Sequence, residues 1–172
     1  MEIYGVTGWK NTGKTTLVEK LIKEMTARGI RVSTVKHAHH DVEIDQPGKD
    51  SHRHRMAGAQ QVILSTEAGW ALMSQTPHVP LAALVSKLDL VDLVLVEGYK
   101  HDTHPKIETH RKGQSRDLVG ADNPSIRAVA SDDRDLETDL DRLDLNNPSQ
   151  IADYILADVG WTPAPLEITS GR

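Results

Sequence analysis

The sequence predicts an α/β protein, with a mainly parallel sheet flanked by helices in a single domain. Apolar segments with strand and helix periodicity alternate along the 172 residues, which is typical of parallel strands joined by helices. Residues 90–96 form a run that is apolar except for Asp92, the pattern of a strand buried on both faces. A glycine-rich loop separates the first strand from the first helix. The length suits one domain with a sizeable core.

The expected elements follow in order from apolar periodicity and turn residues. The first strand covers 3–7, and a helix at 14–28 follows, with one apolar face made of Leu17, Val18, Leu21, Ile22 and Met25. Further strands are expected at 31–36, 61–65, 70–74, 90–96, 106–110 and 126–130. Further helices are expected at 50–59, 80–87 and 148–159, the last with Pro148 at its first position.

The segment Gly8-Trp9-Lys10-Asn11-Thr12-Gly13-Lys14-Thr15, followed by Thr16, matches the phosphate-binding loop of P-loop NTPases. Glycines let successive backbone N–H groups turn inward around phosphate oxygens, and the following helix adds the positive end of its dipole. Lys14 is expected to reach the outer phosphates, and the Thr15 hydroxyl to bind Mg²⁺. Residues 1–161 are therefore predicted to form a P-loop nucleotide-binding domain, and 162–172 a disordered tail.

A P-loop enzyme also needs an acidic residue opposite the loop, to hold the Mg²⁺ shell or to orient water. Asp92 and Glu97 lie at opposite ends of one apolar strand, about 16 Å apart for five residues at ~3.3 Å each. Only one of them can face the phosphates. Because ligands bind at the carboxyl ends of strands in open α/β sheets, Glu97 is the predicted catalytic and metal-binding carboxylate.

A histidine-rich stretch, Lys36-His37-Ala38-His39-His40-Asp41, begins at the carboxyl end of the second strand. Its three histidines could bind a transition metal, or the stretch could be a switch loop that responds to the γ-phosphate and Mg²⁺. The switch is favoured because the histidine spacing matches no zinc-site pattern and the chain has no cysteine. Asp41 is a second predicted catalytic carboxylate.

Two further groups are candidates for ligand or partner contacts. The basic cluster of Lys49, Arg53 and Arg55 either contacts an anionic partner or is a solvated helix face. Asp132 follows a buried strand at the expected ligand edge. Its carboxylate could accept hydrogen bonds from guanine N1–H and the exocyclic amine, or it could cap a turn.

Composition excludes several classes of function. The formal net charge of -5 gives no footprint for nonspecific nucleic-acid binding, and without cysteine there is neither a disulfide framework nor a thiolate metal site. No apolar run approaches the ~18 residues of a membrane span, and the N-terminus carries no signal segment. A cytoplasmic protein without membrane or nucleic-acid contacts is expected.

With these segments identified, the chain resembles the molybdopterin-guanine dinucleotide biosynthesis adaptor family, MobB. The resemblance rests on five stretches in order: 8–16, 36–41, 45–51 with Arg53 and 57–59, 96–100 and 105–108. The Lys-His-x-His-His-Asp and Pro-Gly-Lys-Asp-Ser runs are its most specific parts. Trp9 stands where many members of the wider branch carry a lysine, so Lys10, one position later, is given no trans-acting role.

The resemblance implies a GTP-binding adaptor protein in molybdenum cofactor biosynthesis, a homodimer with weak Mg²⁺-dependent GTPase activity. Its implied partners are the guanylyltransferase that attaches GMP to molybdopterin and the molybdoenzymes that receive the cofactor. Molybdopterin itself is a further candidate ligand. Two alternatives stay open: a metallochaperone GTPase for nickel insertion, supported by the histidines, and a small-molecule P-loop kinase with an arginine-bearing lid.

Overall fold

The computed structural model describes residues 1–38 and 44–162, and the chain divides into two compact units. The first unit comprises Met1–His37 and the chain from Asp89 onward, and the second comprises Ala38–Leu88. The sequence patterns did not indicate this division. The predictions for His39, His40, Asp41 and all but the first residue of the 162–172 tail lie outside the described residues.

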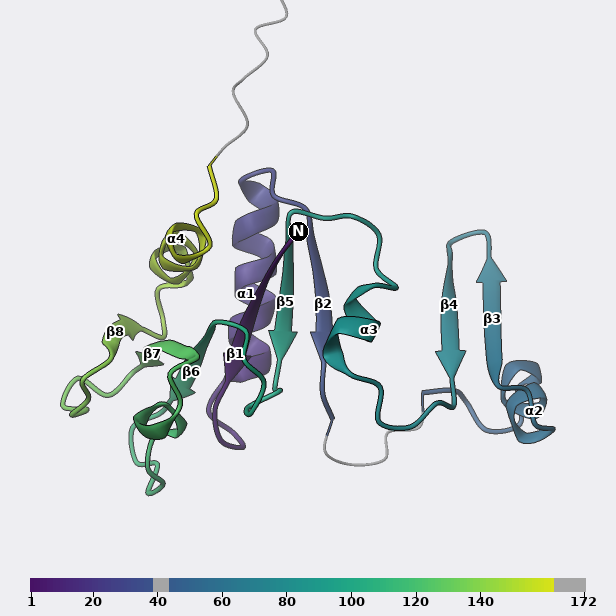
Figure 1. Cartoon of the computed structure of the whole chain (residues 1–172), viewed down its shortest axis with the longest axis horizontal. Coiled ribbons are helices and arrows are strands. Elements are labelled where there is room, and N and C mark those ends of the chain that lie inside the picture. The colour runs from purple at the N-terminus through teal and green to yellow at the C-terminus, as the bar shows by residue number, and fades with distance from the viewer. Residues whose placement is uncertain (39–43, 163–172) are drawn as a thin grey trace, which may run out of the picture. The chain divides into compact units, whose positions relative to one another are not determined.

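The first unit is built on a six-stranded sheet in which every neighbouring pair of strands is parallel (Figure 1). The strand order is β2-β5-β1-β6-β7-β8. The strands are β1 (Glu2–Thr7), β2 (Val32–Lys36), β5 (Leu93–Glu97), β6 (Lys106–His110), β7 (Ile126–Ser131) and β8 (Asp141–Asp144). The fold is thus the predicted α/β class with a parallel sheet. Because all strands run the same way, the segments that follow them meet at one edge.

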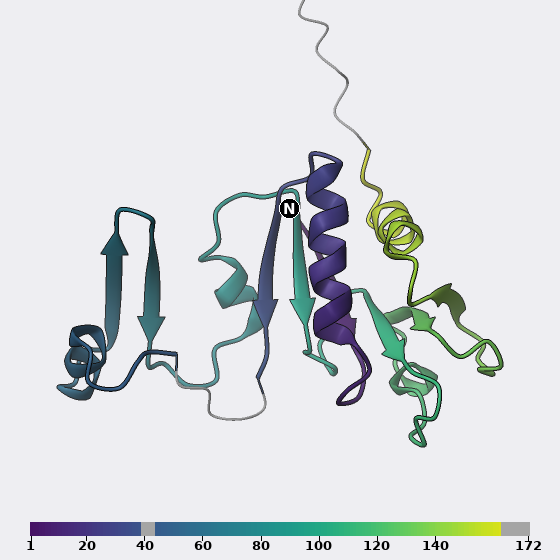
Figure 2. The ribbon, with the colours of Figure 1, turned by 180° about the vertical axis from the view of Figure 1, so that it is seen from behind.

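Two helices, α1 (Lys14–Ala27) and α4 (Pro148–Asp158), pack against each other on one face of this sheet (Figure 2). The apolar faces of these helices pack against alternate residues of the strands and form one core. The helix residues recur with a period of 3.6 and the strand residues with a period of 2. Fully buried strand members of this core are Tyr4, Val6, Leu95, Ile107, Ala128 and Ala130. The phosphate loop, residues 8–15, lies between β1 and α1 at the carboxyl edge.

Two short elements of the first unit were not predicted from the sequence. The strand β8 reads Asp-Arg-Leu-Asp, and only Leu143 is buried. A charged edge strand of this kind shows no apolar alternation. The 3₁₀ turn at Val119–Asp122 is held by Glu108, whose carboxylate accepts hydrogen bonds from the Val119 and Gly120 N–H groups at 2.9 and 2.8 Å. Nothing local in the sequence indicates that long-range contact.

The second unit contains α2 (Asp50–Met56), an antiparallel hairpin of β3 (Gln61–Thr66) and β4 (Gly69–Ser74), and α3 (Leu81–Val85). One face of the hairpin carries the pair Val62 and Met73, and Met73 is buried. The other face carries Ile63, Trp70 and Leu72, which are 64%, 66% and 37% exposed. We call these three residues the hairpin patch. No helix in the described ranges is long and apolar enough to cross a membrane.

Candidate nucleotide-binding site

The phosphate loop has the curled backbone that its motif predicts. Gly8, Asn11 and Gly13 have φ angles of +134°, +64° and +92°, in the region that glycine adopts readily and asparagine tolerates. A β-carbon at Gly8 would lie 2.6 Å from the carbonyl oxygen of Thr109. Only glycine fits that position, because the neighbouring atom belongs to the backbone of β6.

Two buried threonines fix the inside of the loop. The hydroxyl oxygens of Thr12 and Thr109 are 2.7 Å apart and share a hydrogen bond. The carbonyl oxygen of Trp9 lies 2.8 Å from the Thr12 hydroxyl, and that of Thr7 lies 3.1 Å from the Thr109 hydroxyl. Each hydroxyl has one proton. One of the two protons makes the hydrogen bond between the threonines, which ties the loop to β6, and the other is donated to one of the two carbonyl oxygens.

Lys14 begins α1 and folds back over the loop. Its Nζ donates a hydrogen bond of 2.6 Å to the Trp9 carbonyl oxygen. Burial lowers the pKa of Lys14, an effect that Glu97 opposes and that Lys100 and Lys36 reinforce. An anion bound at the loop would favour the charged ammonium form of Lys14.

The side of the loop next to β5 carries an oxygen pair. The Thr15 hydroxyl donates to Glu97 Oε1 at 2.9 Å, and the ammonium of Lys36 lies 3.4 Å from the same carboxylate oxygen. We call Thr15, Lys36 and Glu97 the β5 flank. A hydroxyl beside a carboxylate is the hard-oxygen donor set that suits Mg²⁺, so these residues fit the predicted metal.

Asp92, the competing carboxylate, lies at the amino end of β5 and belongs to another contact. It accepts hydrogen bonds from the Arg31 backbone N–H at 2.8 Å and from the Arg31 guanidinium at 2.9 Å. These bonds lower the pKa of Asp92 to about 2. The structure therefore places Glu97, and not Asp92, beside the phosphate loop.

The opposite side of the loop, next to β6, carries Arg111, which the sequence indicated only as a weaker candidate for a partner surface or a lid and did not place at the phosphate loop. The Arg111 guanidinium Nη2 lies 3.2 Å from the point where a β-carbon on Gly13 would stand. Its Nη1 donates to Asp132 Oδ2 at 3.0 Å, and Asp132 Oδ1 accepts the Lys112 N–H at 2.8 Å. We call Thr109, Arg111 and Asp132 the β6 flank. Asp132 is thus at the predicted edge but already holds the end of β6.

Trp9 anchors the outer side of the loop. Its indole N–H donates to the Asp117 carbonyl oxygen at 2.9 Å. The Lys100 Nζ lies 3.9 Å, and the Arg116 guanidinium carbon 4.7 Å, from the centre of the indole. These are cation–π contacts, which hold two positive charges beside the phosphate loop. Of the other predicted loop residues, Lys10, Asn11 and Thr16 are exposed.

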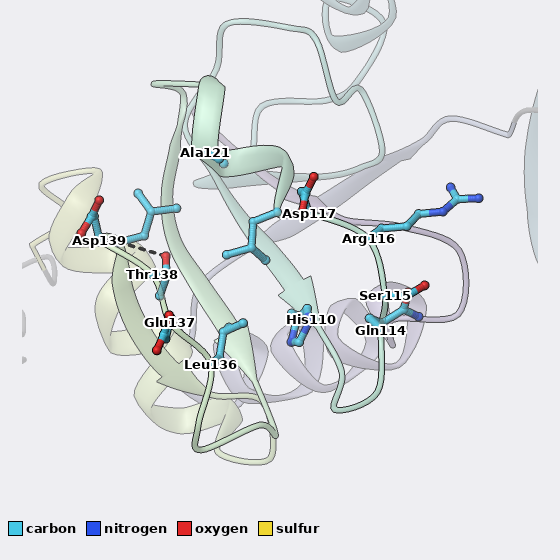
Figure 3. Close-up of a pocket in the computed structure, with 13 residues that line it drawn as sticks. His110, Gln114, Ser115, Arg116, Asp117, Ala121, Leu136, Glu137, Thr138 and Asp139 are labelled. Carbon is cyan, nitrogen blue, oxygen red and sulfur yellow. Dashed lines mark hydrogen bonds between the residues drawn. The ribbon is translucent and has the colours of Figure 1, made fainter.

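Two cavities lie at the carboxyl edge beyond the β6 flank. One, of about 510 Å³, is lined by His110 at the end of β6 and by the loops around Asp117 and Glu137 (Figure 3). The other, of about 470 Å³, lies where β7 and β8 end and is lined by Asp132 and Asp144 among others. Asp132 therefore lines the second of these cavities.

The predicted basic cluster is split. The Arg55 Nε lies 3.6 Å from Asp45 Oδ2, and these side chains are only 19% and 8% exposed, so this pair belongs to the interior of the second unit. Arg53 is 74% exposed, 3.6 Å from Asp50, and Lys49 is exposed. Only Arg53 and Lys49 can meet a partner directly. Within the described ranges no three His, Cys, Asp or Glu side chains gather as metal ligands.

Comparison with known proteins identifies the family. The family of molybdopterin guanine dinucleotide synthesis protein B, MobB, matches residues 3–132. A molybdopterin-guanine dinucleotide biosynthesis adapter protein from Haemophilus influenzae is 47% identical over 156 residues, covering 89% of this chain and 86% of the relative. The Escherichia coli protein of the same name is 44% identical over 156 residues, covering 86% of this chain and 87% of the relative.

Solved structures agree in fold. The crystal structure of a MobB homologue from Bacillus stearothermophilus has a TM-score of 0.70 and 28% identity, covering 93% of this chain and 99% of its own. Bacillus subtilis MobB, at 24% identity, has a TM-score of 0.74 and covers 91% of this chain and 97% of its own. With the family match over most of the chain, these comparisons show that the protein belongs to the MobB family.

Proposed function

We propose that the protein is a GTP-binding adaptor in molybdopterin-guanine dinucleotide biosynthesis, with weak Mg²⁺-dependent GTPase activity. The observation that carries the proposal is the curled phosphate loop with Lys14 folded over it and the Thr15–Glu97 oxygen pair beside it. The pathway is supported by membership of the MobB family and by the names of its relatives.

Within this proposal, the loop N–H groups and Lys14 hold the phosphates, and the β5 flank holds Mg²⁺. The cation would neutralise phosphate charge and help to activate the bond that is cleaved. Lys36 now contacts both oxygens of the Thr15–Glu97 pair, so we expect its ammonium to move aside when the pair binds a divalent cation. Asp41 stays a predicted second carboxylate.

The preference for guanine is supported by family membership and by the position of Asp132. Its carboxylate lines the 470 Å³ cavity at the ends of β7 and β8. Two hydrogen bonds already reach this carboxylate, but a carboxylate has about four acceptor positions, so it can still accept from guanine.

The partners that we propose are the guanylyltransferase of the pathway, its molybdoenzyme clients and a second copy of this chain. The hairpin patch supports the homodimer, because Ile63, Trp70 and Leu72 form an exposed apolar face on an isolated two-stranded sheet. Arg53 and Lys49 supply the anion contact toward partners. Trp70→Ser should therefore shift the molecular mass from dimer to monomer in light scattering, without loss of GTP binding.

The decisive experiment is calorimetric titration of GTP and ATP with and without Mg²⁺, together with a measurement of GTP hydrolysis. We expect GTP to bind more tightly than ATP. Lys14→Ala should lose tenfold or more in affinity, as one charge-assisted contact is worth about 1.5–3 kcal/mol. Lys20→Ala, an exposed lysine on the same helix, is the matched control. Equal binding of GTP by wild type and Lys14→Ala would overturn the proposal.

A further inference from the structure

The two flanks of the phosphate loop define a direction for a bound nucleotide. In P-loop proteins the loop hydroxyl holds a cation that bridges the outer phosphates. The Thr15–Glu97 pair therefore marks the β5 flank as the side of the outer phosphates. Because β5 and β6 lie on opposite sides of β1, the inner phosphate and the nucleoside should lie toward β6.

Arg111 is the cation on that second side. It directly follows β6, and its Nη2 and Nε lie 3.2 and 3.3 Å from the point where a β-carbon on Gly13 would stand. Gly13 is the N-cap of α1, where backbone N–H groups point toward a bound phosphate. The guanidinium thus adds a full positive charge to one side of the phosphate nest, and the glycine at position 13 leaves room for it.

Asp132 fixes the orientation of this guanidinium. A single hydrogen bond of 3.0 Å joins Arg111 Nη1 to Asp132, which is itself held by the Lys112 N–H at 2.8 Å. A guanidinium has five N–H donors in a rigid plane, so the edge that faces Gly13 stays available to an anion. The Arg111 side chain is 44% exposed, which leaves it open to a ligand.

We propose that Arg111 is a nucleotide-binding residue that contacts the inner, α-phosphate of the bound nucleotide, and that Asp132 is its positioning residue. The inference rests on the proposed GTP site and adds a second charged contact on the side away from the metal. It also gives Asp132 a role that does not depend on which base is bound, beside the guanine contact proposed above.

The test compares GTP, GDP and ATP binding by calorimetry, in Mg²⁺ and in EDTA, for wild type, Arg111→Ala, Arg111→Lys and Arg127→Ala. Arg127 is an exposed arginine at the other end of β7 and serves as the control. Arg111→Ala should weaken GTP and GDP by the same factor, about tenfold, in both conditions. Arg111→Lys should recover part of that loss because the charge is kept.

Asp132→Ala should weaken ATP as well as GTP if it positions Arg111, and should weaken GTP by the larger factor if it also contacts guanine. A loss of GTP binding alone would show that Asp132 reads the base only, which would overturn the positioning role. Wild-type affinity in Arg111→Ala, or a loss confined to GTP in Mg²⁺, would overturn the Arg111 contact. If wild type itself bound no GTP, the proposed function would fail and this inference with it. The folded fraction of each variant is checked by thermal unfolding.

Discussion

The two flanks of the phosphate loop differ in their chemical groups and in how deeply these groups are buried. On the β5 flank a hydroxyl, a carboxylate and an ammonium lie within 3.4 Å of one another, and Lys36 is 57% exposed. On the β6 flank the loop meets the buried Thr109 hydroxyl and the backbone of β6. The buried part of the β6 flank shapes the loop, whereas the β5 flank holds the charges that we assign to the metal. Mutations should therefore affect stability on one side and metal-dependent binding on the other.

The largest effect on stability should come from Gly8→Ala, which disrupts the close packing of the loop against β6. The new β-carbon would stand 2.6 Å from the Thr109 carbonyl oxygen, at a φ of +134°. Strain and overpacking together should cost about 4 kcal/mol in the free energy of unfolding. The control is Gly29→Ala, with φ +80° but nothing within 4 Å. Urea titration should show a larger loss of unfolding free energy in Gly8→Ala than in Gly29→Ala. Equal losses would show that the close contact with β6 does not contribute.

The pH dependence of the free energy of unfolding should come in part from His104, which lies before the amino end of β6 and outside the β6 flank. His104 precedes β6, packs on Gly5, and has no hydrogen-bond partner for either ring nitrogen among the described residues. Burial, with Lys106 nearby, lowers the pKa of His104 from 6.5 to about 4, while Asp102 opposes the shift. Stability is then complete above pH 6.5 and is lost as the pH falls toward 4, because only the unfolded chain binds the proton.

The expected loss is at most 1.4 kcal/mol per pH unit across that window, or about 3 kcal/mol in total. Urea titrations at pH 7, 6, 5 and 4.5 measure it. His104→Gln should flatten the slope in this range even if it lowers stability at every pH. An unchanged slope in His104→Gln would place the sensitive group elsewhere.

Glu97→Gln tests the chemistry of the β5 flank. The substitution keeps the shape but removes the charge that we assign to the cation, so Mg²⁺ should no longer strengthen GTP binding, a loss of about tenfold. Binding in EDTA should stay close to wild type, and hydrolysis should fall. Asp92→Asn, at the other end of β5, is the control. A greater loss of hydrolysis in Asp92→Asn would contradict the assignment.

Thr109→Val should have the smallest effect of this series. It removes the hydrogen bond to Thr12 but keeps the volume, so we expect a loss of about 1 kcal/mol in unfolding free energy. The Mg²⁺ dependence of GTP binding should not change, because the β5 flank is untouched. If Thr109→Val altered the Mg²⁺ dependence, the two flanks would not be separable.

Part of this contrast could be predicted from sequence. The phosphate loop is a local motif, and the rule that ligands bind at carboxyl strand ends placed Glu97 rather than Asp92 beside it. Arg111 depends on strand order, because only the pairing of β6 with β1 brings residue 111 to Gly13. No periodicity encodes that order.

The second unit shows the same limit. The run of basic residues at 49–55 does not reveal that Arg55 points inward to Asp45 while Arg53 stays exposed to solvent. Both faces of the hairpin carry apolar side chains, so the sequence could not tell which of them are buried. Tertiary contact decides these cases, and it buries Met73 while it leaves Trp70 exposed.

The most direct test of the account is a crystal structure with a non-hydrolysable GTP analogue and Mn²⁺ in place of Mg²⁺, with the metal located by its anomalous signal. We expect Mn²⁺ beside Thr15 and Glu97, the α-phosphate beside Arg111, and the base toward the ends of β7 and β8. A metal bound on the β6 flank, or a nucleoside that extends toward β5, would contradict the division of the loop into a metal side and a nucleoside side.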